Sequence, residues 1–429
     1  MLPSPEERKR QRQQKAEERK RKQAQAKKLL LRLVIAAVVL LACGILIFRL
    51  TRNAPASAQA DSSKPAAVPK DTITSETTPD PALPPTTVIH YAAAGDLNVN
   101  ADTVYSGGSS YNYTETFMDV AHLLSDADIA SINFEGNFYG EPYGSSFSAP
   151  QSMATALCKA GVDLVQMANS YSINRGIAGL VASIDAVRSA GMEPLGVYAT
   201  NEDYKAEKGY TIRTVNGIKL AFVAFTKGMD GMALPPGSED CVNVLYTDYD
   251  STYQNIDSQK INTVLAAVAK EEPDLVIALL HWGSEFNNTI SSSQEDIKKL
   301  MYAGGVDAII GTHSHYVQKM ELDAETGQFI AYSLGDFFSD AQRAGSEYSV
   351  VLDLEITKDN TTGETAITGY SYTPIFTIEG TDGLLRVVRL HEAMEDYNDF
   401  HVNSVSEKTY NSMIYGKERI EYRVKMNQK

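Results

Sequence analysis

The sequence predicts an α/β fold, and three observations support this interpretation. Short apolar runs rich in β-branched residues recur from Val88 onward, and they are too short to be independent helices. Amphipathic segments at 179–190 and 258–271 lie between these runs and are typical of helices. Asn216-Gly217 separates two further runs, as in a β-hairpin. Strands that alternate with helices, with hairpins in the second half, predict a mixed sheet or two sheets.

The expected strands are bounded by polar or glycine-containing segments. In chain order they are 89–94, 129–134, 164–167, 195–198, 210–215, 218–225, 275–280, 308–310, 329–332 and 348–356. After residue 385 the chain becomes polar and rich in Tyr, Glu and Lys. We therefore expect one folded domain at 88–385 and a polar C-terminal extension at 386–429.

The segment before this domain has the pattern of a membrane anchor. Leu29–Phe48 is apolar apart from Arg32 and is long enough to cross a bilayer, so a transmembrane helix is expected at 29–49. The basic segment 1–28 precedes it, which favours a cytoplasmic N-terminus and an extracytoplasmic C-terminal domain. The alternative is a cleaved signal peptide, with Ala56-Ser57-Ala58 as a weak cleavage site. Residues 50–87, rich in Pro, Ser and Thr, predict a disordered linker.

The distribution of charge limits the classes of partner. Residues 1–52 carry 14 basic and 4 acidic side chains, and the remainder carries 25 basic and 50 acidic ones. A strongly acidic body excludes nucleic acid as the expected partner, because phosphate backbones require a cationic surface. Cys158 and Cys241 lie after the apolar segment, where a disulfide is allowed but not required, and neither belongs to a CxxC motif.

Histidines follow two of the predicted strands. His281-Trp282-Gly283-Ser284-Glu285 comes after the run that ends at Leu280, and Gly311-Thr312-His313-Ser314-His315 comes after Ile310. In extended chain, a His-x-His pair projects both rings to one side, since side chains alternate. A single histidine at a strand end is more often structural, but the pair together with a third histidine favours a metal site.

Other predicted strands also end in polar side chains. Ala94-Gly95-Asp96, Asn133-Phe134-Glu135-Gly136, Ala168-Asn169-Ser170 and Ser333-Leu334-Gly335-Asp336 each follow a strand. Together with the histidines they offer the carboxylates and imidazoles that a two-metal site requires.

In this combination and order the motifs resemble the CapA family of capsule and poly-gamma-glutamate synthesis proteins, within the calcineurin-like metallophosphatase superfamily. The resemblance covers about residues 88–378. It implies a two-sheet metallophosphatase-like sandwich flanked by helices, and divalent metal ions as cofactors, of which Mn, Fe, Zn and Mg are the candidates. It also implies that Asp96 and His315 hold one metal, that Glu135 bridges, and that His281 and His313 hold the second. Further side chains expected to line the site are Asn98, Asn133, Ser170, Asn174, Trp282, Glu285 and Asp336.

One motif departs from the family pattern. Where the family usually reads Ala-Asn-Asn-His, this chain reads Ala168-Asn169-Ser170-Tyr171. A hydroxyl replaces the expected amide ligand, and the phenol of Tyr171 replaces the catalytic histidine. A phenol with an ordinary pKa of about 10 is a poor general acid at neutral pH. Asn169 is then the amide that could complete the metal ligands, and Asn174 stands where the family has a carboxylate.

Three functions remain open from the sequence. The first is a membrane-anchored protein that takes part in biosynthesis, export or anchoring of an anionic capsule polymer, with membrane-bound capsule synthesis proteins as further partners. The second is a metal-dependent phosphoester hydrolase acting outside the cytoplasm. The third is a structural relic that binds no metal.

Overall fold

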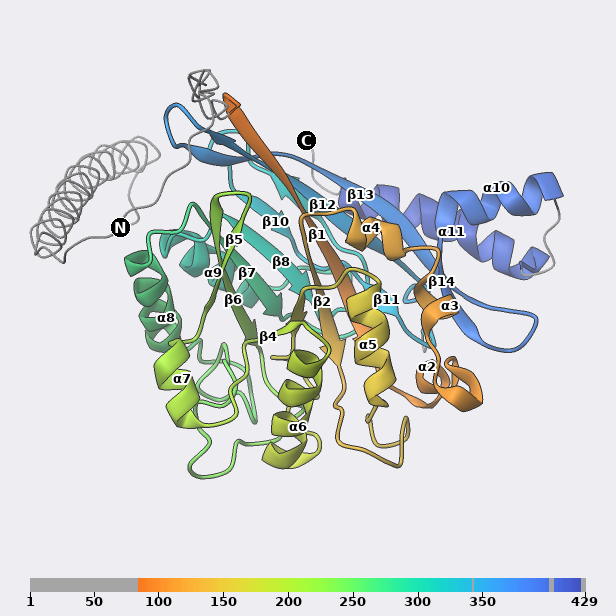
Figure 1. Cartoon of the computed structure of the whole chain (residues 1–429), viewed down its shortest axis with the longest axis horizontal. Coiled ribbons are helices and arrows are strands. Elements are labelled where there is room, and N and C mark those ends of the chain that lie inside the picture. Colours follow the sequence, from red (N-terminus) through yellow and green to blue (C-terminus); the bar gives the residue numbers. More distant parts are fainter. Residues whose placement is uncertain (1–83, 342, 401–404, 426–429) are drawn as a thin grey trace, which may run out of the picture. The chain divides into compact units, whose positions relative to one another are not determined.

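The computed structural model describes residues 84–341, 343–400 and 405–425, and it contains two β-sheets with helices on their outer faces (Figure 1). The predicted two-sheet α/β fold is confirmed. No helix among these residues is long and apolar enough to cross a bilayer, and the expected span at 29–49 lies outside the described ranges.

The first sheet has the strand order β14-β13-β12-β1-β2-β3-β4, with β11 paired to β1. Its strands are β1 (Thr86–Asn98), β2 (Ile129–Glu135), β3 (Leu164–Gln166), β4 (Glu193–Leu195), β11 (Asp336–Phe338), β12 (Tyr348–Asp359), β13 (Thr365–Glu379) and β14 (Leu385–Arg389). Strands β1 to β4 are parallel, whereas β12 to β14 form an antiparallel extension.

The second sheet has the order β5-β6-β7-β8-β10-β9. Its strands are β5 (Thr211–Val215), β6 (Ile218–Thr226), β7 (Leu275–His281), β8 (Ala308–Thr312), β9 (Met320–Leu322) and β10 (Phe329–Ala331). The hairpin predicted at Asn216-Gly217 joins β5 to β6. Strands β6, β7, β8 and β10 run parallel, so their carboxyl ends lie along one edge.

The helices connect the strands and cover the sheets. They are α2 (Ala101–Tyr105), α3 (Thr114–Phe117), α4 (Ala121–Ser125), α5 (Gln151–Lys159), α6 (Gly176–Ser189), α7 (Asn201–Glu207), α8 (Ser258–Lys270), α9 (Ser292–Ala303), α10 (Leu390–Phe400) and α11 (Glu407–Val424), with a short 3₁₀ turn η1 at Gly108–Ser110. The two helices expected at 179–190 and 258–271 correspond to α6 and α8.

Side chains along β1 alternate between the two faces of the first sheet, and the two faces belong to different core clusters. Ile89 and Tyr91 pack between the sheets with Phe222 and Leu279 of the second sheet. Ala92 belongs to the cluster on the opposite face of the first sheet, under α5 and α6. A third cluster joins the outer face of the second sheet to α8 and α9. The central strands β2, β6, β7 and β8 are therefore buried on both faces, which explains why their sequences are largely apolar.

The segment after residue 385 packs on this core. Leu385 begins β14, which pairs with β13, and the α10 and α11 helices lie beside these strands (Figure 1). Leu390, Met413 and Ile420 are fully buried in the cluster between the sheets. The expected boundary between 385 and 386 falls within β14, and the polar segment beyond it contributes to the core.

Candidate metal centre

The polar motifs meet because parallel strands of both sheets end at the same region. Asp96 lies near the end of β1, Glu135 ends β2 and His281 ends β7. The loop after β8 carries His313 and His315. Asp336 begins β11 and pairs with Asp96 in the parallel β1–β11 register. Two sets of potential ligands result, each from three different strand ends or loops.

The first set consists of Glu135, His281 and His313, whose ligand atoms lie within 4.8 Å of one another. His281 Nε2 is 3.3 Å from Glu135 Oε1, and the rings of His281 and His313 have centroids 4.4 Å apart. The other nitrogen of His281, Nδ1, lies 3.2 Å from Thr312 Oγ1 and 3.3 Å from Asn133 Nδ2. These contacts fix the ring so that Nε2 faces the carboxylate.

The second set consists of Asp96, His315 and Asp336. His315 Nδ1 is 2.7 Å from Asp336 Oδ1 and 3.7 Å from Asp96 Oδ2. Asp96 also accepts hydrogen bonds from the His313 backbone N–H at 2.9 Å and from Asn133 Nδ2 at 2.6 Å. Asn133 therefore holds both sets together, since its amide contacts Asp96, Glu135 and His281.

The backbone at the histidine motif differs from the expected extended chain. His313 has φ of 87° and His315 has φ of 58°, so both lie in the left-handed region. Non-glycine residues adopt this region at a cost, and such strain concentrates at functional sites. Because the chain turns here, His313 joins the first set and His315 joins the second. The extended His-x-His geometry predicted from the sequence is wrong, although both rings reach the cluster.

Burial governs the ionisation of these groups. Burial, followed by the charge of Asp336, raises the pKa of Asp96 to about 6 against the opposing effect of His315. Burial and the charge of Asp96 raise the pKa of Glu135 well above its ordinary value. Burial also lowers the pKa of His281 and His313 well below the ordinary value, which leaves both imidazoles neutral.

The pKa of His315 shifts in the opposite direction. Burial by itself lowers this pKa, but the charges of Asp336, Glu135 and Asp96 outweigh burial and raise it well above its ordinary value. The cluster thus concentrates carboxylates among buried side chains. Such a field attracts a cation, whether this is a proton on His315 or a metal ion.

The chemistry of the donors fits a divalent metal ion. The six side chains are buried, and they offer three carboxylates and three imidazoles. His313 Nε2 is a buried nitrogen without a hydrogen-bond partner among the described residues, which a metal ligand position would explain. Imidazole and carboxylate together suit Zn, Fe and Mn, so the ligand types do not select one metal.

The segment that departs from the family pattern lies against the first set. Ser170 Oγ is 3.1 Å from His281 Nε2. Tyr171 stacks on Phe147 with ring centroids 4.6 Å apart. Burial raises the pKa of the Tyr171 phenol above its ordinary value, and nearby Glu135 and Glu285 raise it further. The phenol is therefore a hydrogen-bond donor at neutral pH.

Asn169 is occupied by contacts with the protein. Its Nδ2 donates to Asn133 Oδ1 at 3.1 Å and to the Phe134 carbonyl at 2.7 Å, and its Oδ1 accepts from the Tyr171 N–H. In this orientation Asn169 supports Asn133, which contacts both ligand sets. A role as a metal ligand stays a prediction and would require the amide to turn.

The remaining predicted residues surround the cluster at different depths. Asn98 ends β1, and its Nδ2 is buried without a described partner. Asn174 belongs to the turn before α6, where its N–H donates to the Tyr171 carbonyl. Trp282 points into the outer core and donates to the Tyr332 carbonyl at 2.9 Å. Glu285 is exposed, and its charge acts on Glu135 and Tyr171.

Two contributors were not identified from the sequence. Thr312 contacts His281 Nδ1, and Lys227 lies close enough to lower the pKa of His281 and His313 through its charge. Lys227 directly follows β6, so the same strand-end criterion that selected the histidines would have identified it.

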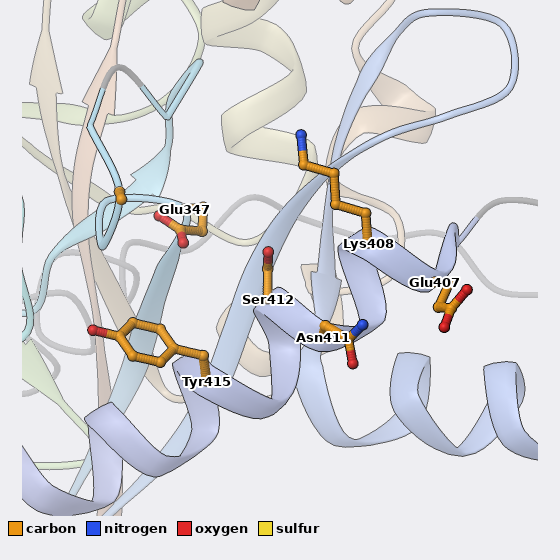
Figure 2. A pocket seen from close by; sticks show the side chains of 7 residues that line it. Glu347, Glu407, Lys408, Asn411, Ser412 and Tyr415 are labelled. Carbon is orange, nitrogen blue, oxygen red and sulfur yellow. The ribbon is translucent and has the colours of Figure 1, made fainter.

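A hollow on another part of the domain is distinct from this centre. It lies between α11 and the segment before β12, and Lys408, Ser412 and Tyr415 border it opposite Glu347 (Figure 2). None of its lining residues belongs to the ligand sets.

Comparisons with solved structures give distant likenesses only. A phosphatase from Mycoplasma pneumoniae is 12% identical, with a TM-score of 0.41 over 68% of this chain and 94% of that one. The calcineurin-like phosphoesterase YfkN from Bacillus subtilis is 16% identical, with a TM-score of 0.42 over 79% of this chain and 99% of that one.

Comparisons of sequence are more specific. The capsule biosynthesis protein CapA of Bacillus anthracis is 27% identical over 264 residues, which cover 59% of this chain and 60% of that protein. The PGA biosynthesis protein CapA of Bacillus subtilis is 26% identical over 245 residues, covering 55% and 58%. The chain thus matches about three fifths of each relative. The sequence model of the bacterial capsule synthesis protein PGA_cap matches residues 90–341, more than half of the chain, and the chain belongs to this family.

Proposed function

We propose that this protein takes part in the biosynthesis, export or anchoring of an anionic capsule polymer such as poly-gamma-glutamate. One observation carries the proposal: all six residues of the two ligand sets lie within the region that matches the capsule synthesis family. The matched region therefore includes the whole buried cluster of potential metal ligands. Its involvement in polymer synthesis is what the proposal adds to family membership.

The proposed location is the outer side of the cell membrane. The apolar segment 29–49 with its basic N-terminal flank supports a single span that leaves the folded domain outside the cytoplasm. The Pro-, Ser- and Thr-rich sequence between the apolar segment and β1 has the composition of a linker, which would let the domain reach a polymer as it leaves a membrane-bound synthesis complex. The proposed partners are that polymer and the membrane-bound capsule synthesis proteins.

The proposed cofactor is one or two divalent metal ions. Glu135, His281 and His313 would hold one, and Asp96, His315 and Asp336 would hold the other. A metal bound here would act as a Lewis acid on a carbonyl or phosphoryl oxygen and would offset the charge of the carboxylates. The chain itself supplies ligand orientation through Asn133 and Thr312, and a protonated phenol at Tyr171.

A second function is favoured by the same ligand sets: metal-dependent hydrolysis of a phosphoester. The carboxylates and imidazoles of both sets are in place, which favours catalysis. Ser170 and Tyr171 disfavour rapid catalysis, because a phenol with a raised pKa transfers its proton poorly to a leaving group. We therefore place the hydrolase second.

The test combines a cellular and a biochemical measurement. In the host cell, deletion of the gene should reduce cell-bound anionic polymer, and expression of the wild-type chain should restore it, whereas Asp96→Asn with His281→Gln should not. On the purified full-length chain, metal content and turnover of an aryl phosphodiester are measured in parallel. Unchanged polymer in the deletion strain would contradict the capsule function. Rapid turnover by the wild-type chain would move the hydrolase to first place.

A further inference from the structure

Lys227 lies at the same edge as the ligand cluster, directly after β6. Thr226 pairs with His281 in the parallel β6–β7 register, and the Lys227 backbone N–H donates to the His281 carbonyl at 2.8 Å. The lysine ammonium donates to the Gly283 carbonyl at 3.0 Å, two residues beyond His281. The strand pairing therefore places the Lys227 side chain beside the segment that contains His281, a candidate metal ligand.

The ammonium of Lys227 lacks the partner that comparable lysines have. Lys260 and Lys358, which are also largely shielded from solvent, pair with carboxylates at 3.1 and 3.0 Å. Lys319 pairs with a carboxylate at 2.5 Å. Lys227 is half-buried over the ring of Tyr253, 4.7 Å from its centroid, and no carboxylate of the described residues lies within 4.0 Å of its ammonium. Glu285 and Asp230 act on this charge from a greater distance, so a ligand could supply the direct ionic partner that the other three lysines have within the protein.

The position of Lys227 is rigid. Thr226 Oγ1 donates to the Gly228 carbonyl at 2.8 Å, and it accepts from the Gly228 N–H. A Cβ at Gly228 would lie 2.2 Å from the Tyr249 carbonyl oxygen, so the turn packs closely against the neighbouring loop. The next residue, Met229, is fully buried. These contacts hold the backbone that carries Lys227, and the Gly283 carbonyl and the Tyr253 ring hold its ammonium, so less ordering is needed when a ligand binds.

The surroundings of the site make this cation distinctive. Glu285 and Asp230 are exposed near Lys227 and act on its charge, and the chain after residue 52 carries 50 acidic against 25 basic side chains. An anionic ligand would be repelled by most of this surface. Local positive charge beside the cluster is therefore required for direct contact with such a ligand.

We propose that Lys227 anchors an oxyanion, either a carboxylate of an anionic polymer or a phosphate group, beside the ligand cluster. The inference rests on the proposed function, in which this cluster handles an anionic substrate. Lysine acts here as a compact point charge, which suits either oxyanion. Partial burial strengthens the attraction relative to an exposed lysine.

The test measures binding by calorimetry with the full-length chain and its Lys227→Gln and Lys227→Arg variants. The two probes are a γ-linked glutamate oligomer and phenyl phosphate, each at low and high salt. Lys408→Gln is the matched control, since Lys408 lines the separate hollow at α11 (Figure 2). Metal content and thermal melting of each variant are measured on the same samples.

We expect Lys227→Gln to weaken binding about tenfold or more, as for loss of a charge-assisted hydrogen bond. Lys227→Arg should retain most of the affinity, and Lys408→Gln all of it. Metal content should not change, and the effect should diminish at high salt. If Lys227→Gln binds the glutamate oligomer more weakly than the wild-type chain does, the anion is a polymer carboxylate. If only phenyl phosphate is bound more weakly, the anion is a phosphoester.

Two results would overturn the inference, and they differ in what they say of the proposed function. Equal affinity of Lys227→Gln and the wild-type chain, with measurable binding by both, would overturn the role of Lys227 alone. Absence of binding by the wild-type chain to either probe would overturn both the role of Lys227 and direct handling of an anion by the cluster.

Discussion

The Oγ of Ser170 lies 3.1 Å from Nε2 of His281, the same nitrogen that faces Glu135 Oε1 at 3.3 Å. The hydroxyl that replaces the family's amide therefore occupies the side of the imidazole where a metal would bind. The amide of the preceding Asn169 is instead turned toward Asn133 and the Phe134 carbonyl. The departure from the family pattern thus changes the ligand environment and not only the sequence.

Restoring the family residues should raise hydrolytic activity. The double variant Ser170→Asn with Tyr171→His supplies an amide beside His281 and an imidazole with an ordinary pKa of about 6.5. Because general acid catalysis contributes about 10²- to 10⁴-fold, aryl phosphodiester turnover should rise by about 10²-fold or more. The single Ser170→Asn variant separates the ligand effect from the proton donor. Turnover by the wild-type chain equal to that of the double variant would show that these residues do not limit catalysis.

Removing the carboxylate of Asp336 should cost one metal equivalent. Asp336→Asn keeps the shape of the side chain but removes a charge that lies 2.7 Å from His315. The set of Glu135, His281 and His313 should still bind its metal. The control is Asp353→Asn, which alters an exposed His–Asp pair with His90 at 3.0 Å. Elemental analysis after dialysis should show a loss for Asp336→Asn only, and equal metal content in the two variants would contradict the assignment.

Chelation of metal should lower thermal stability. Asp96, Glu135 and Asp336 are buried together. Burial and the charge of Asp336 raise the pKa of Asp96, and burial and the charges of Asp96 and Asp336 raise the pKa of Glu135, so a cation relieves this repulsion. A ligand present at 100 times its dissociation constant stabilises the native state by about 2.7 kcal/mol. The melting temperature should therefore fall by several degrees in chelator and recover when Mn or Zn is restored. The Asp96→Asn, His281→Gln variant is the control and should not respond to chelator.

The predicted membrane topology can be tested in intact cells. Protease added outside should remove the folded domain, while an epitope within the basic segment 1–28 stays protected. The expectation follows from the charge bias around 29–49. Permeabilised cells, in which both parts become accessible, are the control. Recovery of the whole chain in the soluble cytoplasmic fraction would contradict the proposed anchor.

The sequence predicted the parts of the site that follow strong strand signals. The runs before Asp96, Glu135 and His281 are largely apolar because these strands are mostly buried on both faces, and each run ends at its polar motif. When such strands are parallel, their carboxyl ends meet at one edge. The predicted strand at 195–198 was shifted, since β4 spans Glu193–Leu195 and the chain then bridges from Val197 to Val242.

Other features carry no comparable local signal. Strand β11 has only three residues, yet its pairing with β1 brings Asp336 beside Asp96. Strand β13 contains Gly369 and Pro374, and both residue types argue against a strand. Gly369 lies next to a bulge in the β12–β13 pairing. Pro374 lies one residue before Ile375, the first residue of β13 that pairs with β14. The turns at His313 and His315 depend on the Asp96 carboxylate that accepts the His313 N–H, a contact across 217 residues.

Gly95 shows how such a long-range contact can be tested. A Cβ at this position would lie 1.8 Å from the Gly335 carbonyl oxygen, which accepts the Asp96 N–H at 3.0 Å. Gly95→Ala must therefore push β11 away from β1 and separate Asp336 from Asp96, at a cost of about 3 kcal/mol in the free energy of unfolding. Gly369→Ala is the matched control, because its Cβ would meet only Glu355 Cβ at 4.0 Å, and it should change stability by no more than about 1 kcal/mol. Urea unfolding measures both variants, and elemental analysis should show metal loss in Gly95→Ala alone. Wild-type stability of Gly95→Ala would mean that β1 and β11 do not approach as closely as the strand register requires.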